Sequence, residues 1–255
     1  MVSALPAPLP DEDWFVPLRR QQQARVRLLL FHYAGGGPQV FRPWLRWVPE
    51  DVEVVAFQLP GRRPGHGHRL LTSIDEVVAR ASSDFLAQMD RPAVVYGHSI
   101  GALIAFEMLR ASHRRGGPQA RHLAVSARRA PHCAPPLRPL HLLPDAEFVE
   151  CLEAYGGTPR EILDDECLLS AFLPRLRADF ALSETYRFVD GPLLSCPVSA
   201  LAGTDDVEAC VSDVSEWRWQ TSSSFRLQRV RGGHFFIHAR EPVIADALIQ
   251  LLATT

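Results

Sequence analysis

The segment YGHSIGA, residues 96–102, places a serine between two glycines directly after the apolar run PAVVY. In the pattern G-x-S-x-G a strand turns abruptly into a helix and holds the serine in a strained conformation, and side chains at the glycine positions would clash with neighbouring chain. The next residues, ALIAFEMLR, have the apolar spacing of a helix, whose N-terminus favours negative charge near Ser99. We therefore predict that Ser99 is a nucleophile and not a simple helix cap, which needs no glycine on both sides.

A serine nucleophile needs a base and an orienting carboxylate, which in this setting are expected in the chain order Ser, Asp, His. One apolar run ends in Gly203-Thr204-Asp205-Asp206, and a later one ends in RGGH at His234. Both positions follow strand ends, where ligands gather in open α/β sheets. We predict His234 as the base and Asp206 as the acid, because the spacing from Gly203 favours Asp206, and we keep Asp205 as the alternative.

The negative charge of an acyl-transfer intermediate needs two backbone N–H donors, an oxyanion hole. Ile100, directly after the serine, supplies one of them. The other is expected from the glycine-rich loop in LLLFHYAGGGPQ, where we predict Ala34, with Tyr33 and Gly35 as alternatives. The loop lacks the GK[ST] ending of a P-loop and the G-x-G-x-x-G of a dinucleotide fold, so neither phosphate site is predicted.

These residues must be positioned by an α/β fold, because short apolar runs alternate with helical patterns along the chain, as in a mostly parallel sheet. The expected strands are Val26–Tyr33, Val52–Gln58, Ala93–Tyr96, His122–Ser126, Val198–Ala202 and Phe225–Val230. The expected helices between them are Ile74–Met89, Ala102–Ser112 and Val243–Leu252. We predict a single domain over residues 1–255.

Residues 140–188 interrupt the alternation, because no strand is predicted there. One helix is expected to begin at Pro144-Asp145 and to end at Gly156-Gly157. The capping box Thr158-Pro159-Arg160-Glu161, with proline at the first helical position, is expected to begin a second. We predict a helical lid over the strand ends. Its apolar side chains are expected to pack the lid on the core or to line an acyl channel: Phe148, Leu152, Tyr155, Leu169, Phe172, Leu173, Leu176, Phe180 and Tyr186.

The composition excludes several classes of protein. With 47% hydrophobic residues, 22% charged residues and a net charge of -2, the chain shows no basic footprint for nucleic acid. Five cysteines, odd in number and without a CxxC pair, predict neither a disulfide framework nor a zinc site. The first residues do not have the pattern of a signal peptide, and no run of about 18 apolar residues occurs. We expect a cytoplasmic protein, with no membrane span, that is a monomer.

Seven segments together resemble the type II (editing) thioesterases of polyketide and nonribosomal peptide synthesis. In chain order they are FHYAGGGPQVFRPW, VVAFQLPGR, YGHSIGALIAFE, SARRAP, FLPRLRADFALSETY, ALAGTDD and GGHFFI. The resemblance covers about residues 28–237 and implies an α/β-hydrolase fold with a helical lid. It also implies hydrolysis of acyl groups from the phosphopantetheine arm of acyl or peptidyl carrier protein domains, with no cofactor of the enzyme's own.

Carried over by motif, the resemblance implies roles for five residues: Ser99 as nucleophile, Asp206 as acid, His234 as base, and Ala34 and Ile100 as oxyanion donors. Two positions depart from the family's pattern. His32 stands where the family usually has proline, and Ile100 where it usually has methionine. The second departure changes a side chain beside the acyl pocket but leaves the backbone donor in place.

Three rival functions are kept: a carboxylesterase or lipase acting on free esters, an acyltransferase, and a catalytically inactive hydrolase fold that serves as a binding module. The pantetheine arm is expected to enter between the lid and the AGGG loop. Four arginine pairs are candidates for contact with an acidic carrier protein, although each of them is also consistent with ordinary solvated charge. They are Arg19-Arg20, Arg62-Arg63, Arg114-Arg115 and Arg128-Arg129.

Overall fold

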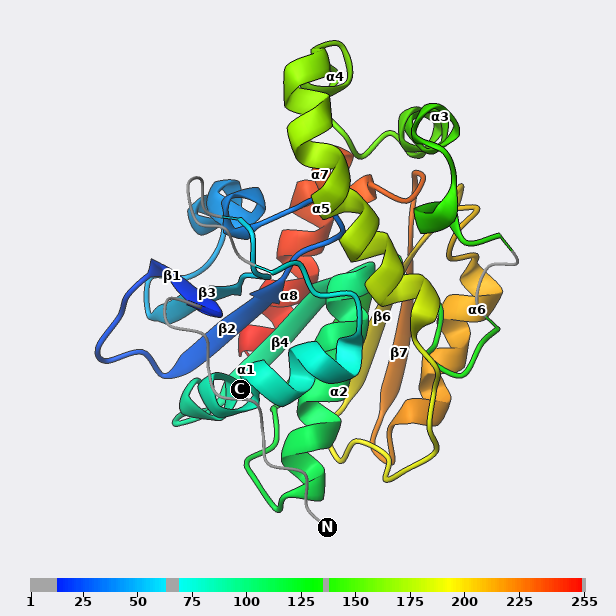
Figure 1. Cartoon of the computed structure of the whole chain (residues 1–255). Helices are drawn as coiled ribbons and strands as arrows, with labels where there is room; N and C mark the ends of the chain where they lie inside the picture. Colours follow the sequence, from blue (N-terminus) through cyan, green and yellow to red (C-terminus); the bar gives the residue numbers. More distant parts are fainter. Residues whose placement is uncertain (1–12, 63–68, 135–137, 254–255) are drawn as a thin grey trace.

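The computed structural model describes residues 13–62, 69–134 and 138–253, and its strands form one seven-stranded sheet (Figure 1). The strand order is β1-β3-β2-β4-β5-β6-β7. The strands are β1 (Phe15–Arg19), β2 (Val26–Phe31), β3 (Val52–Phe57), β4 (Ala93–His98), β5 (His122–Ser126), β6 (Val198–Gly203) and β7 (Phe225–Val230). The β1–β3 pair is antiparallel, and the other pairs of the sheet are parallel. The predicted mostly parallel α/β sheet is confirmed.

Helices cover both faces of this sheet, and each face has its own buried cluster. Because side chains alternate along a strand, Leu29 of β2 belongs to one cluster, while Leu28 and Leu30 belong to the other. The first cluster includes residues of α1 (Ile74–Ala87), α2 (Ile100–Arg114), α6 (Val211–Ser215) and η3 (Glu216–Gln220). The second includes residues of η1 (Pro38–Arg46), α7 (Phe236–Ala239) and α8 (Glu241–Ala253).

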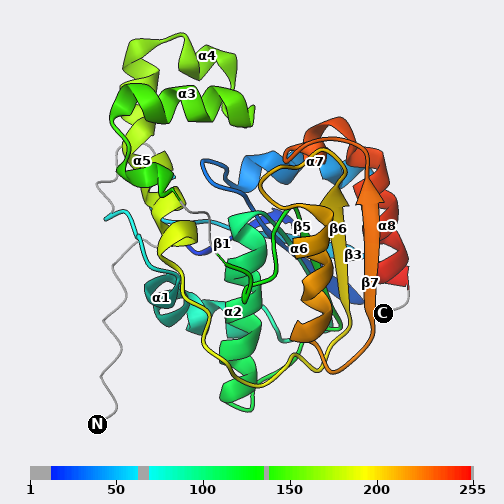
Figure 2. The same ribbon diagram turned by 90° about the vertical axis from the view of Figure 1, so that its right-hand side faces the viewer.

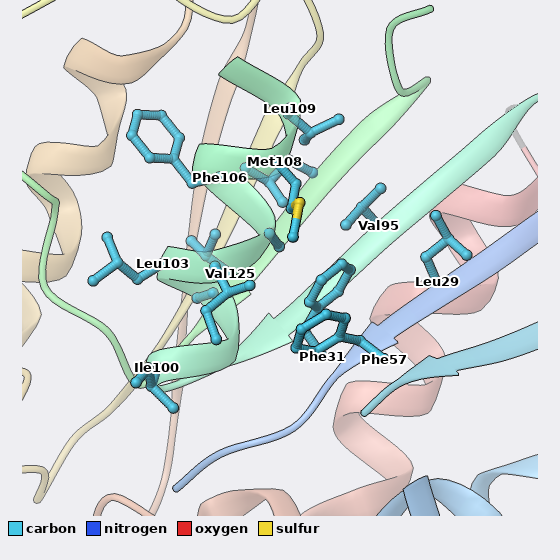
Figure 3. Packing of buried hydrophobic residues seen from close by; sticks show 14 of the residues in the cluster. Leu29, Phe31, Phe57, Val95, Ile100, Leu103, Phe106, Met108, Leu109 and Val125 are labelled. Carbon is cyan, nitrogen blue, oxygen red and sulfur yellow. The ribbon is translucent and has the colours of Figure 1, made fainter. Parts of the chain in front are cut away.

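The helix α2 is anchored firmly beneath the site. Its residues Leu103, Phe106 and Leu109 are buried and share a cluster with Phe31 and Val95 of the sheet (Figure 3). Full burial of one such side chain stabilises the fold by about 1.5–3 kcal/mol. The N-terminus of α2 is therefore a rigid support for the residue that precedes it.

The predicted strands and helices of the sheet region are present, with ends that differ by at most two residues from the prediction. The strand β1 is an element that the sequence pattern did not predict. It has five residues, contains Pro17, and lies at the edge of the sheet, where a missing N–H is tolerated. A strand so short and interrupted shows no clear alternation.

The insertion between β5 and β6 is helical. It contains η2 (Leu140–Leu142), α3 (Asp145–Tyr155), α4 (Arg160–Leu163) and α5 (Glu166–Thr185), and residues 138–188 contain no strand. In two perpendicular views α3 and α4 stand off the sheet on the side where α7 lies (Figures 1 and 2). Phe148, Leu152, Leu173 and Leu176 form a separate small core within this insertion.

The helix ends in the insertion agree only partly with the prediction. Gly156 ends α3 in the left-handed conformation, with φ 70°, as predicted. The predicted capping box is wrong: Pro159, and not Thr158, is the N-cap of α4, and no side chain caps that end. Because Pro159 is not helical, α4 begins at Arg160, one residue later than predicted, and it has only four residues. The long helix α5 begins later, where the Asp165 carboxylate accepts the N–H groups of Cys167 and Leu168.

Candidate active site

Ser99 lies at the junction of β4 and α2 in a strained conformation, with φ 54° and ψ −122°. The neighbouring chain explains the two glycines around it. A Cβ at Gly97 would lie 2.5 Å from the Ala102 backbone, and one at Gly101 would lie 2.3 Å from the Phe31 carbonyl oxygen. Because backbone cannot move aside as a flexible side chain does, both positions require glycine. Such strain costs about 1–3 kcal/mol and persists where the surrounding structure holds it.

The structure brings the serine, the histidine and one of the two aspartates together. His234 Nε2 lies 2.9 Å from Ser99 Oγ, and His234 Nδ1 lies 2.9 Å from Asp206 Oδ2. Asp206 Oδ1 accepts the N–H groups of Glu208 at 2.9 Å and Ala209 at 3.0 Å. These bonds fix the carboxylate, whose side chain is 0% exposed.

The neighbouring Asp205 does not reach the histidine. It is exposed to solvent, and its N–H donates to the Gly232 carbonyl. The geometry thus distinguishes the two alternatives left by the sequence. It places Asp206, and not Asp205, in line with the imidazole and the hydroxyl.

The two predicted oxyanion donors, Ala34 and Ile100, both line the cavity that contains Ser99. Within the described part of the chain neither N–H donates a hydrogen bond, so both are available to a ligand. The alternative donor Gly35 is occupied, because its N–H donates to Asp179 Oδ2 at 2.7 Å. These contacts favour Ala34 over Gly35 for the second donor.

The cavity beside Ser99 has a volume of about 300 Å³ and extends beneath the helical insertion. One wall consists of the segment that follows β5, residues 127–134, and the insertion contributes Leu152, Tyr155, Leu176, Phe180 and Tyr186. Four of the apolar side chains predicted to pack the lid or line an acyl channel form the small core of the insertion: Phe148, Leu152, Leu173 and Leu176. Of these, Leu152 and Leu176 also line the cavity. A space of this size accepts a small or medium acyl chain.

His98, between Gly97 and Ser99, is fully buried next to the His234 ring. Its ring lies 5.6 Å from that of His234, and its Nδ1 lies 2.5 Å from Ser126 Oγ. Burial holds the pKa of His98 well below its ordinary value, so the ring is neutral at physiological pH. A neutral ring adds no competing positive charge beside His234.

The arginine pairs proposed for carrier contact are not a shared surface. Arg62 is buried in an ion pair with Asp179, its side chain 4% exposed, and Arg128 lines the cavity with its Nη1 on Ser183 Oγ. Arg63 lies outside the described residues. Arg114 is the last residue of α2, which is 15 residues long, so it lies about 22 Å from Ser99 along the helix axis. The prediction is therefore wrong for Arg62 as a surface charge, while Arg128 is half-buried and lines the cavity.

Comparison with known proteins places this geometry in a family. The family described as "Thioesterase domain" matches residues 26–252. The chain belongs to the thioesterase family. This thioesterase is 36% identical to Thioesterase PikA5 of Streptomyces venezuelae, over 95% of this chain and 86% of that protein. It is 35% identical to the Linear gramicidin dehydrogenase LgrE of Brevibacillus parabrevis, over 95% of this chain and 92% of that protein.

A solved structure extends the likeness to three dimensions. The type II thioesterase BorB from the borrelidin biosynthetic cluster superposes with a TM-score of 0.86 at 32% identity, over 94% of this chain and 97% of that one. The predicted resemblance to type II thioesterases and the predicted α/β-hydrolase fold are both confirmed. The described helices of this thioesterase include none long and apolar enough to cross a bilayer. Its described residues also contain no group of His, Cys, Asp and Glu side chains suited to a metal ion.

Among the residues of the site, Asp179 was not predicted from the sequence, whereas Tyr155 was predicted only as a lid side chain and Arg62 only as a surface charge. The Tyr155 ring of the insertion lies 6.0 Å from that of His234, while Asp179 and Arg62 contact the glycine-rich loop. A signal for the last two was present, because they lie in the segments FLPRLRADFALSETY and VVAFQLPGR that carry the resemblance. The contacts of Asp179 with Gly35 and with Arg62 join residues more than 100 positions apart, which no local pattern shows.

Proposed function

We propose that the chain is a stand-alone type II thioesterase that removes stalled or aberrant acyl groups from the phosphopantetheine arm of acyl or peptidyl carrier protein domains. The observation that carries the proposal is the connected row Ser99–His234–Asp206, with both spacings at 2.9 Å, in which Ser99 and His234 line a cavity of about 300 Å³. The solved relative described as a type II thioesterase from a biosynthetic cluster supports the substrate class. No cofactor is required, and we propose a cytoplasmic monomer.

The first half of the reaction transfers the acyl group to the serine. His234 Nε2 takes the Ser99 hydroxyl proton as Oγ attacks the thioester carbonyl carbon. Asp206, fixed by two backbone N–H groups, holds the imidazole tautomer and offsets its positive charge. The N–H groups of Ala34 and Ile100 stabilise the oxyanion, and each such donor is worth about 10²–10³ in turnover.

The second half releases the acid. The pantetheine thiol departs easily, because an unperturbed thiol has a pKa of about 8.5, far below that of an alcohol. Water then attacks the acyl-Ser99 carbonyl and gives its proton to His234, which returns it to Ser99 Oγ. Both halves use the same donors and the same base.

A comparison of three substrates that carry one acyl group tests this proposal: the acyl-carrier thioester, the acyl-pantetheine thioester and a simple oxyester. We expect kcat/KM for the carrier thioester to exceed that for the oxyester at least tenfold, and the Ser99→Ala variant to lose all three activities. A carboxylesterase or lipase would hydrolyse the oxyester as fast as the carrier thioester. That result would remove the carrier protein from the account.

A further inference from the structure

The glycine-rich loop after β2 is held by two buried side chains from distant parts of the chain. Asp179 of the insertion helix α5 accepts the Gly35 N–H on Oδ2 at 2.7 Å, and the same oxygen accepts a hydrogen bond from Arg62 Nη2. Arg62, which follows β3, donates from Nε to the Gly36 carbonyl at 3.1 Å and from Nη1 to the Pro60 carbonyl at 3.2 Å. The Arg62 and Asp179 side chains are 4% and 3% exposed.

The peptide unit that carries the Ala34 N–H is fixed from its other end. The Tyr33 carbonyl accepts the Gly36 N–H at 3.0 Å and lies 2.7 Å from His32 Nδ1. In a trans peptide the C=O and the next N–H point in opposite directions. With the Tyr33 carbonyl held inside the loop, the Ala34 N–H is directed away from it. On the far side of Ala34, the next peptide is held by Asp179.

The insertion also touches the loop by packing. Gly35 has φ 76°, and a Cβ placed there would lie 2.6 Å from Leu176 Cδ2, one turn before Asp179 on α5. The loop and α5 therefore meet through the close approach of Leu176 to Gly35 and through the hydrogen bond from the Gly35 N–H to Asp179. A shift of α5 away from the sheet would break the Asp179 contact with the Gly35 N–H.

We propose that Asp179, with Arg62, is a positioning residue that holds the Ala34 N–H in the geometry of an oxyanion donor, so that the hole is complete only when α5 is seated on the loop. This inference rests on the proposed function, in which Ala34 is that donor. Neither side chain needs to touch the substrate. Loss of the contacts that Asp179 and Arg62 make with the loop is therefore expected to weaken stabilisation of the transition state. Binding of the substrate in its ground state should stay nearly unchanged.

The test uses the nearly isosteric variant Asp179→Asn, which removes the charge that pairs with Arg62. With an acyl-pantetheine thioester we expect kcat to fall about 10- to 100-fold, short of or close to the loss of one full oxyanion donor, with KM within about twofold. The matched control is Asp145→Asn. Asp145 of α3 also pairs with an arginine of α5, Arg177, but it is exposed and does not contact the loop.

A second measurement reports on the oxyanion hole alone. In a trifluoromethyl ketone that carries the acyl chain, Ser99 Oγ bonds to the carbonyl carbon, the carbonyl oxygen becomes the oxyanion, and the hydroxyl proton passes to His234. We expect the affinity of this ketone to fall by the same factor as kcat in Asp179→Asn. The affinity of the matching thioether, which forms no oxyanion, is expected to stay within about twofold.

An unpaired Arg62 could prevent Asp179→Asn from folding, because breaking a buried ion pair is strongly destabilising. The double variant Arg62→Gln/Asp179→Asn removes that charge and gives the same readouts. Ketone affinity and kcat within twofold of wild type in either folded variant would overturn the inference. Failure of the proposed function is distinguishable, because it would appear as absent thioester hydrolysis by the wild-type enzyme, while the ketone measurement needs no turnover.

Discussion

Replacement of Asp206 by asparagine tests the arrangement of the triad most informatively. Asp206 Oδ1 accepts two backbone N–H groups, so an asparagine is expected to place its carbonyl oxygen there and its NH₂ toward His234 Nδ1. In the reverse orientation the asparagine NH₂ would face the N–H groups of Glu208 and Ala209. Each N–H group left without an acceptor would cost about 1–3 kcal/mol. The imidazole then carries its proton on Nε2 and cannot accept the proton of Ser99.

We expect this variant to lose about 10⁴ in kcat, as the wrong tautomer does in serine proteases, which is about 5.5 kcal/mol of activation free energy. The assay is steady-state hydrolysis of an acyl-pantetheine thioester, with KM expected to change little. Asp205→Asn is the matched control and should keep kcat within twofold, since Asp205 is exposed and does not touch His234. A loss below tenfold for Asp206→Asn, or a greater loss for Asp205→Asn, would refute this reasoning.

Three further outcomes concern stability. Gly101→Ala should destabilise the fold by more than about 3 kcal/mol in urea unfolding, because the new Cβ would lie 2.3 Å and 2.5 Å from the carbonyl oxygens of Phe31 and His32; a loss below 1 kcal/mol would contradict the packing. Burial, aided by the charge of Arg62, lowers the pKa of His32 from 6.5 to about 3, so the unfolded chain binds a proton below pH 6.5 that the folded one does not. Stability should therefore fall with falling pH, and between pH 6 and 5 wild type should lose about 1 kcal/mol more than His32→Gln; equal slopes would show that His32 is protonated in the fold. Phe148→Ala, in the small core of the insertion, should cost about 3–5 kcal/mol locally and increase amide exchange in α3 and α5 without unfolding the sheet; unchanged exchange would refute a separate core.

The sequence predicts those parts of the fold whose cause is local. The strand β4, the glycines at 97 and 101 and the helix α2 follow one another, so the strained turn at Ser99 is visible in seven letters. His234 is also predictable, because a strand end and a Gly-Gly turn precede it directly. In each case the physical reason lies within a few residues of the position itself.

The rest depends on contacts between distant segments. Asp205 and Asp206 differ in their contacts only because the turn after β6 points one carboxylate at His234 and leaves the other in solvent. Ala34 and Gly35 differ as donors only because Asp179, 144 positions away from Gly35, occupies one N–H. The burial of Arg62 has the same cause, since its partner comes from the insertion. Tertiary packing determines these differences between neighbouring residues, and they leave no periodic pattern in the sequence.

The central claim is that Ser99 carries the acyl group during turnover. Rapid quenching of the wild-type enzyme with an acyl-pantetheine thioester, followed by peptide mass spectrometry, measures this directly. The account predicts that the peptide containing Ser99 gains the mass of the acyl group in the first turnover, and that the Ser99→Ala variant gains none. Full turnover without acylation of that peptide, or acylation that persists in Ser99→Ala, would contradict it.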